Sequence, residues 1–204
     1  MTNPAYLRAS SRSDLSQWVV HFVRPSLFQA PNQIINASDI FNSIIVEGQI
    51  RPSLSEHITR CCPSGATCFY DAPPKAWPEI ISTNPNARQP LGLIVQKTAL
   101  WYLGGRPVIY TENTTDSYWP EAERYRIVHT DLLRQPQPID WTHEREWRVR
   151  GPLHLYTPVI PYTWWWPIVP SEDWLPYIWQ TYPGIHTVYV ISLSRSVERN
   201  TIVA

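Results

Sequence analysis

Proline and the large aromatic residues constrain this chain more than any other feature of its sequence. The 204 residues include 21 prolines, 11 tryptophans and 11 tyrosines, with a single methionine. Proline breaks helix interiors and is confined to the edges and ends of strands, whereas tryptophan and tyrosine favour strands and offer flat surfaces to ligands. We therefore expect a strand-rich domain whose loops are long and stiffened by proline.

Length and charge favour one domain without a general electrostatic preference. A chain of 204 residues supports one full-sized core and is short for two. We expect a single domain over 1–204, with a core at 17–151 and a Pro- and Trp-rich part at 152–204 that packs on it. Seventeen basic residues balance seventeen acidic ones, so net charge supplies no general attraction to nucleic acid or to a membrane surface.

The cysteines and the apolar runs indicate the compartment. Cys61 and Cys62 are adjacent and Cys68 lies in an apolar run, which provides neither a disulfide framework nor the spacing of a metal knuckle. The first residues are polar and lack the apolar segment of a secretory signal. No run approaches the ~18–20 apolar residues of a membrane helix. We expect a cytoplasmic protein that does not associate with membranes.

Strand-like and helix-like segments alternate irregularly along the chain, which predicts an α+β fold. An apolar stripe at helical spacing, closed by Gly48, predicts a helix at 36–48. The segment 121–134 is compatible with either a helix or a strand, and the tryptophans at 164–166 are expected in an ordered loop. Short helices are also expected at 98–103 and 171–181, and β-branched and aromatic runs predict strands at 17–23, 66–71, 91–96, 106–110, 139–149 and 187–193.

The predicted strand at 139–149 carries two acidic residues with candidate chemistry. Because alternate residues of a strand share a face, we expect Glu144, Glu146 and Arg148 to point the same way, with the carboxylates ~6.5–7 Å apart along the strand. Such a pair can divide between stabilising a sugar cation and deprotonating a nucleophile. The alternative is a solvated charged face with cross-strand pairs.

Two other predicted strands carry candidate ligand contacts. His21 lies in the centre of the first strand, where a neutral imidazole can bind a ligand hydroxyl or complete a hydrogen bond at the core boundary. Tyr70 can stack on a flat ring or pack at the core margin. A cysteine protease with Cys68 as its nucleophile lacks a local signature. We find no glycine-rich nucleotide motif and no acidic cluster with metal-ligand spacing.

The tryptophans near the C-terminal end of the sequence have two interpretations. Exposed at 164–166 and at Trp174 and Trp179, they would stack on sugars or bases, at about 1–3 kcal/mol per stacked base. Buried, they would fill a secondary core that proline stiffens.

The order of these segments resembles a known family. It is similar to bacterial abortive-infection and toxin-like proteins related to the ADP-ribosyltransferase fold, in particular the DNA ADP-ribosyltransferase toxins. The resemblance covers roughly 17–151, and the middle strand lacks a Ser-Thr-Ser motif. It implies two small, twisted, mostly antiparallel sheets around a cleft, with short flanking helices. The segments that carry it are His21-Phe22, Ile44 to Ser53, Cys68 to Pro74, Leu91 to Val95, and Glu144 to Arg148.

The resemblance implies that NAD is bound as a substrate and gives each candidate residue a role. His21, with Phe22 beside it, would contact a ribose hydroxyl of the adenosine half, and Arg24 and Arg51 are alternatives to His21 for the first contact with NAD. Arg51 would otherwise contact the pyrophosphate. Tyr70 would pack against the nicotinamide. The acidic pair would be catalytic: Glu146 would orient the nicotinamide ribose and stabilise the cation, and Glu144 would position or deprotonate the acceptor.

The function implied is NAD-dependent ADP-ribosyl transfer to a nucleic acid or protein acceptor, in bacterial defence or as a toxin, and a cognate antitoxin is a candidate partner. Two other classes stay open. One is a non-catalytic, partner-binding regulator on the same fold, with the Trp-rich loop as its contact surface. The other is an aromatic platform that binds carbohydrate or single-stranded nucleic acid.

Overall fold

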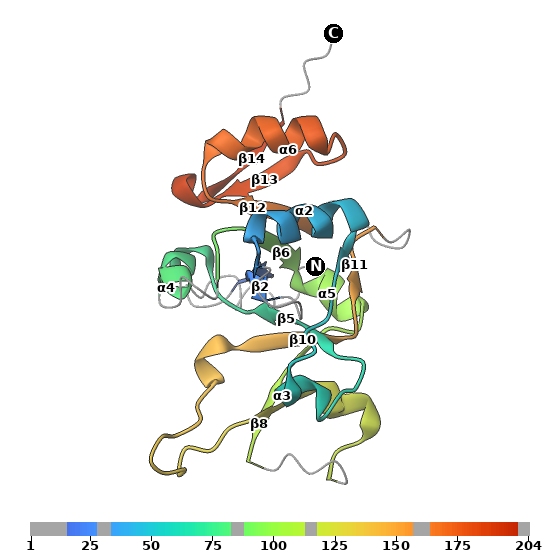
Figure 1. Ribbon diagram of the computed structural model, residues 1–204, viewed down its shortest axis with the longest axis vertical. Coiled ribbons are helices and arrows are strands. Elements are labelled where there is room, and N and C mark those ends of the chain that lie inside the picture. The colour runs from blue at the N-terminus through green and yellow to red at the C-terminus, as the bar shows by residue number, and fades with distance from the viewer. Residues whose placement is uncertain (1–15, 28–33, 83–87, 113–117, 157–163, 200–204) are drawn as a thin grey trace, which may run out of the picture.

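One eight-stranded sheet organises the protein, whose computed structural model describes residues 16–27, 34–82, 88–112, 118–156 and 164–199 (Figure 1). The α+β class is as predicted. The strand order is β14-β13-β12-β6-β1-β5-β10-β7; within this described sheet β12 and β13 pair in parallel and the other neighbours pair antiparallel. The bounds are β1 Trp18–Phe22, β5 Ala66–Tyr70, β6 Gly92–Gln96, β7 Arg106–Pro107, β10 Glu146–Arg150, β12 Trp165–Val169, β13 Thr187–Val190 and β14 Arg195–Glu198.

Short ladders and short helices complete the fold. Three two-stranded ladders join β2 Ser26–Leu27 to β3 Ile34–Ile35, β4 Gln49–Ile50 to β11 Leu153–His154, and β8 Ile109–Thr111 to β9 Ile127–His129. The α-helices are α2 Ala37–Glu47, α3 Glu56–Thr59, α4 Trp77–Ser82, α5 Lys97–Tyr102 and α6 Leu175–Thr181. Within the described residues, none of these helices is long and apolar enough to cross a membrane.

The strand pairing is least extensive in the middle of the sheet, between β1 and β5. β1 pairs with β6 along its whole length, from Trp18↔Gln96 to Phe22↔Gly92, and β10 pairs with β5 equally fully. β1 and β5, by contrast, share the single pair Val20↔Tyr70. The resemblance implied two small sheets. The structure has instead one sheet whose five-stranded and three-stranded halves meet at this pair.

Helices cover both faces of the sheet. α2, α5 and α6 pack their apolar residues on the face that carries Val19, Phe69 and Leu93. On the opposite face, Trp77 of α4 packs with Val20 and the neighbouring side chains of the second core cluster. Side chains of β1 thus alternate between two cores, as expected for a strand covered on both sides.

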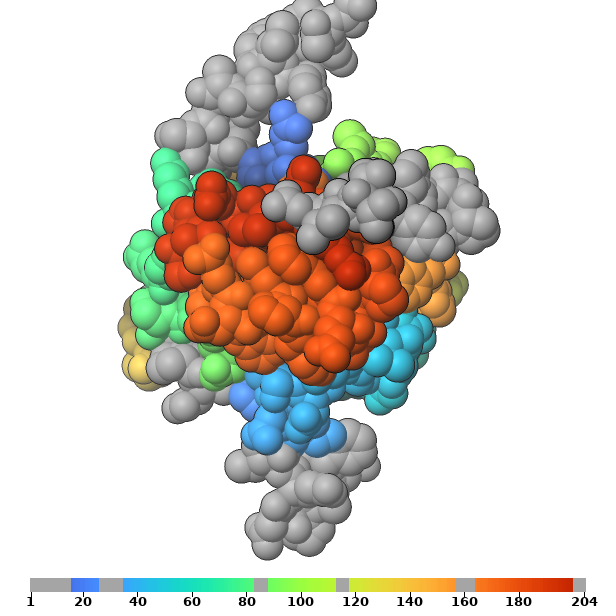
Figure 2. Space-filling model, turned by 90° about the horizontal axis from the view of Figure 1, so that it is seen from above, coloured from blue at the N-terminus to red at the C-terminus, as the bar shows by residue number. Residues whose placement is uncertain are grey.

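The Trp-rich segment is part of the sheet rather than a loop, which corrects the expectation for 164–166. β12 begins at Trp165 and pairs with β6, and the side chains of Trp164 and Trp165 are only 2% and 4% exposed. β-branched and aromatic residues favour a strand here, and Pro167 sits within it. Residues 164–199 therefore supply three strands and α6, which form most of one end of the molecule (Figure 2). Trp164 and Trp165 are buried in the core, whereas Trp166, Trp174 and Trp179 are partly buried and pack against it.

Gly92 tests the close contact between β6 and β1. A Cβ atom at Gly92 would lie 2.2 Å from the backbone oxygen of His21, so Gly92→Ala has to push the two strands apart. We expect a loss of about 1–3 kcal/mol in the free energy of unfolding, measured by urea denaturation. Gly184→Ala is the control, because nothing lies within 4 Å of its new Cβ. Equal stability of the two variants would contradict this packing.

Candidate functional site

Three adjacent strands bring the predicted site residues into neighbouring positions. β1, β5 and β10 lie side by side, and the register places Val20, Tyr70 and Glu146 in one row across them. Residues paired in this way share a face of the sheet. Tyr70 and Glu146 are therefore neighbours on one face, and His21 stands one position beyond the row.

The strand predicted at 139–149 is broken, which corrects the geometry expected for its two glutamates. Thr142–Glu144 forms a 3-10 turn, Arg145 has a φ of 46°, and β10 begins only at Glu146. Asp71 fixes the break: its N–H donates to the Arg145 carbonyl at 3.2 Å, and its carboxylate lies 3.6 Å from the Arg145 guanidinium. A left-handed residue inside the segment reverses the alternation assumed for a continuous strand. Glu146 and Arg148 do share a face, and Glu144 lies on the preceding turn.

Glu146 forms a buried ion pair with Arg148. The guanidinium donates in bidentate fashion, from Nε to Oε1 at 2.9 Å and from Nη2 to Oε2 at 3.0 Å. Arg148 also donates to the carbonyls of Tyr125 and Ile127. Burial, and then the charge of Glu146, raise the pKa of the nearby Cys68 thiol well above its ordinary value, so this thiol is protonated. The two hydrogen bonds from Arg148 hold the carboxylate of Glu146 in one orientation.

Glu144 belongs to a second, more open cluster around the Tyr70 hydroxyl. Arg24 donates to that hydroxyl at 2.6 Å, and Arg88 donates to it through Nε at 3.0 Å. Arg88 also binds Glu144 at 2.7 Å, and the hydroxyl donates to the same carboxylate oxygen at 3.4 Å. Two guanidinium groups thus meet at one phenol hydroxyl, and one of them, Arg88, also pairs with the carboxylate. Burial raises the pKa of Tyr70, which keeps the phenol neutral.

His21 lies on the other face of the sheet from Tyr70. Its ring is 5.7 Å from that of Phe69, and its Nδ1 donates to the carbonyl oxygen of Cys68 at 2.9 Å. Burial lowers the pKa of the imidazole, so the ring is neutral. Since Nδ1 carries the proton, Nε2 is a hydrogen-bond acceptor. The ring bridges the two halves of the sheet where the pairing of β1 with β5 has ended.

The remaining predicted contacts lie elsewhere. Phe22 is buried and meets Trp77 edge-on at 5.8 Å, so it is a core residue. Arg51 is exposed and binds Glu47, the last residue of α2, at 2.8 Å. The flat face of Tyr70 that was expected to meet nicotinamide has the Arg88 guanidinium 4.6 Å from its centre.

Arg88 is the residue that sequence reasoning missed. It follows a proline-containing stretch of the sequence and carries no motif or periodicity that marks it, and only the fold places its side chain beside Tyr70 and Glu144. Within the described residues, no group of three or more His, Cys, Asp or Glu side chains is arranged to hold a metal ion. The arrangement offers two cations for an oxyanion, one accessible carboxylate and one oriented, buried carboxylate.

The buried ion pair makes a prediction about stability. Arg148→Met leaves the Glu146 carboxylate buried without its partner, which should cost about 3–5 kcal/mol in the free energy of unfolding. The double variant Glu146→Leu with Arg148→Met should recover much of this loss, because no charge is left buried. Arg51→Met is the control, since its ion pair with Glu47 is exposed and contributes little. If Arg148→Met is as stable as Arg51→Met, Glu146 and Arg148 do not form a buried ion pair.

The environment of His21 predicts a dependence of stability on pH. Because burial lowers its pKa from 6.5, acid protonates this imidazole in the unfolded chain before it does so in the folded one. Stability should therefore fall as the pH drops through 6.5. His21→Asn, which keeps a donor for Cys68 but does not titrate, should lose less stability between about pH 7 and about pH 5.5. Exposed His186→Asn should behave like the unmodified protein, and identical slopes for all three would refute the prediction.

No protein-family model, no curated protein and no solved structure matches this chain. The resemblance of its segments to ADP-ribosyltransferases rests on short motifs, and the side chains around β1, β5 and β10 are the basis for a function.

Proposed function

We propose that this protein is an NAD-dependent ADP-ribosyltransferase of the bacterial defence or toxin type, which acts on a nucleic acid or protein acceptor. The observation that carries the proposal is the adjacency of β1, β5 and β10, with Tyr70 and Glu146 in one row across β5 and β10 and His21 next to it. In the related fold an early strand ends in His or Arg, a middle strand supplies an aromatic residue or Ser/Thr, and a late strand supplies the catalytic Glu. Here the three strands are consecutive in the sheet.

The charges around Tyr70 suit a dinucleotide. Arg24 and Arg88 converge on the same hydroxyl, and guanidinium groups match the oxygens of a pyrophosphate in bidentate geometry. Arg24 replaces Arg51 in this proposed role, because Arg51 is bound to Glu47 on the exposed end of α2. Arg88 would leave the ring of Tyr70 when it binds phosphate, which uncovers the ring for nicotinamide.

The two carboxylates would divide the chemistry. The glycosidic C–N bond of NAD breaks and nicotinamide leaves with the bonding electrons, so positive charge develops on the ribose. Glu146, oriented by Arg148, keeps lone pairs that can accept from a ribose hydroxyl and stabilise that charge. Glu144 is 16% exposed and would take the proton of the acceptor as its oxygen or nitrogen attacks.

A non-catalytic, partner-binding regulator is the second candidate. It is favoured by the bidentate pairing of Glu146, which neutralises the expected catalytic carboxylate, and by the position of His21 on the opposite face. Of the tryptophans expected to form its contact surface, Trp164 and Trp165 are buried. The exposed turn with Leu132 and Leu133, 58% and 82% exposed, is the better candidate, because exposed apolar clusters mark interfaces.

Nicotinamide release from labelled NAD tests the proposal. We expect Glu144→Gln and Glu146→Gln each to reduce release, and transfer of label to DNA, RNA or protein, by at least about 10²-fold. Arg88→Gln should weaken NAD binding, measured by titration calorimetry. Glu172→Gln, at an exposed site of the C-terminal part, is the matched control and should leave all three measurements unchanged.

The outcomes separate the two candidates. If the unmodified protein neither releases nicotinamide nor binds NAD, the transferase is rejected and the regulator is left as the candidate. Release that survives in Glu144→Gln and Glu146→Gln would exclude the carboxylates from the chemistry. Because Glu146→Gln disturbs a buried pair, its folding is checked by circular dichroism, and Glu144→Gln provides the independent result.

A further inference from the structure

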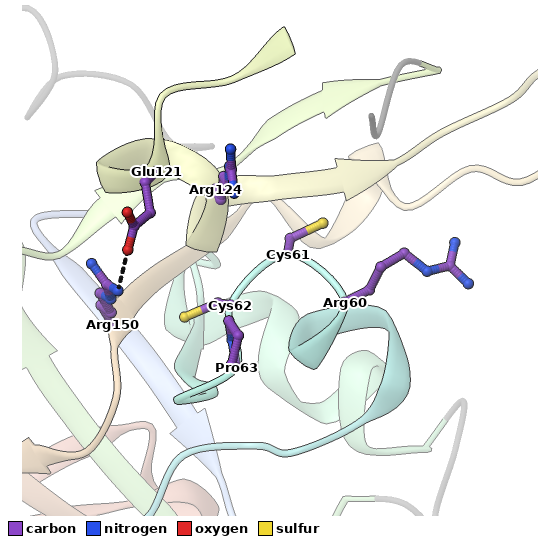
Figure 3. Close-up of a pocket in the computed structure, with 7 residues that line it drawn as sticks. All are labelled: Arg60, Cys61, Cys62, Pro63, Glu121, Arg124 and Arg150. Carbon is purple, nitrogen blue, oxygen red and sulfur yellow. Dashed lines mark hydrogen bonds and ion pairs between the residues drawn. The ribbon is translucent and has the colours of Figure 1, made fainter. Parts of the chain in front are cut away.

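A separate cavity lies at the far end of β10 from Glu146. It has a volume of about 130 Å³ and is formed where the turn after α3, the 3-10 helix Glu121–Arg126 and the end of β10 meet. Figure 3 shows the lining side chains, with Arg150 and Glu121 facing each other, and the Arg60 guanidinium directed outward at the rim. The lining residues are Arg60, Cys61, Cys62, Pro63, Glu121, Arg124 and Arg150.

The lining is strongly basic. Three arginines and one glutamate line the cavity, which gives its lining an excess of two positive charges in a protein that has no net charge. The existing ion pairs hold these arginines loosely: Arg150 lies 3.5 Å from Glu121, and Arg60 lies 3.6 Å from Glu56, all with exposed side chains. Exposed pairs of this length contribute little to stability. Their guanidinium donors can therefore be redirected to a ligand.

Other contacts make part of the cavity rigid. The Nε of Arg124 donates to the carbonyl of Trp119 at 3.1 Å, which aligns this side chain along its helix. The floor is formed by Cys61 and Cys62, which are 7% and 3% exposed, and the thiol of Cys62 is bound to the carbonyl of Gly65 at 3.1 Å. A low-polarity floor beneath guanidinium groups strengthens their interaction with an anion.

Size restricts the ligand. Clefts that enclose drug-sized molecules measure about 300–1,000 Å³, so a cavity of about 130 Å³ accepts one tetrahedral oxyanion and excludes a whole dinucleotide. Guanidinium groups bind phosphate oxygens in bidentate geometry. We propose that this cavity is a phosphate-binding site, for inorganic phosphate or the terminal phosphate of a phosphomonoester, separate from the cluster around Tyr70.

Titration with inorganic phosphate tests the site directly and does not depend on turnover of NAD. We expect saturable binding by calorimetry, weakened at least tenfold in Arg150→Gln and only partly restored in Arg150→Lys, which keeps the charge but loses the bidentate fork. Arg195→Gln, an exposed arginine on β14, is the matched control and should bind like the unmodified protein. Phosphoserine, compared with serine, distinguishes a phosphomonoester from the free ion. Its affinity should rise as the pH passes about 6, where the ester loses its second proton.

Each outcome of the two titrations either supports or rejects the phosphate site. Binding of both probes that depends on Arg150 supports the site, and binding of one probe alone identifies the source of the phosphate. No saturable binding of either probe, or equal binding by Arg150→Gln and Arg195→Gln, rejects it. Arg124→Gln supplies a second variant, with circular dichroism to establish that it folds.

Discussion

The single pairing between β1 and β5 is the contact on which the rest of the structure depends. Every other pair of neighbours in the described eight-stranded sheet shares between two and five residue pairs, but β1 and β5 share the single pair Val20↔Tyr70. Side chains replace the missing ladder: His21 bonds to the Cys68 carbonyl, and Arg24 bonds to the Tyr70 hydroxyl. Polar side chains are thus drawn to the middle of the sheet because the two halves separate there, and the candidate site forms at that place.

The two glutamates of one short segment have different environments, and this difference arises from one residue. The left-handed turn at Arg145 keeps Glu144 out of β10 and lets it reach Arg88, while Glu146 enters the strand and meets Arg148. One carboxylate is accessible and shares its arginine with a phenol. The other is buried and held by a bidentate partner. Such divergence between neighbouring acids is a common basis for assigning them separate roles.

The local sequence pattern predicted those helices and strands whose secondary structure does not depend on distant contacts. The helix ending at Gly48, the strands at 17–23, 66–71 and 91–96, and the α+β class follow from periodicity and turn residues. The errors arose where tertiary contacts decide. Asp71 contacts Arg145 where the predicted strand is broken, β6 pairs with Trp165 and Trp166 in β12, and Arg88 binds Glu144. None of these partners is close in sequence to the residue it controls, so no local pattern encodes them.

The pairing of β12 with β6 has a consequence for how the fold is completed. β6 is an apolar strand of the central sheet, and the segment that covers its outer edge comes some seventy positions later in the sequence. Until β12 arrives, that edge offers unpaired N–H and carbonyl groups beside buried side chains, as aggregation-prone intermediates do. This edge of β6 is therefore covered only after residues 165–169 have been synthesised.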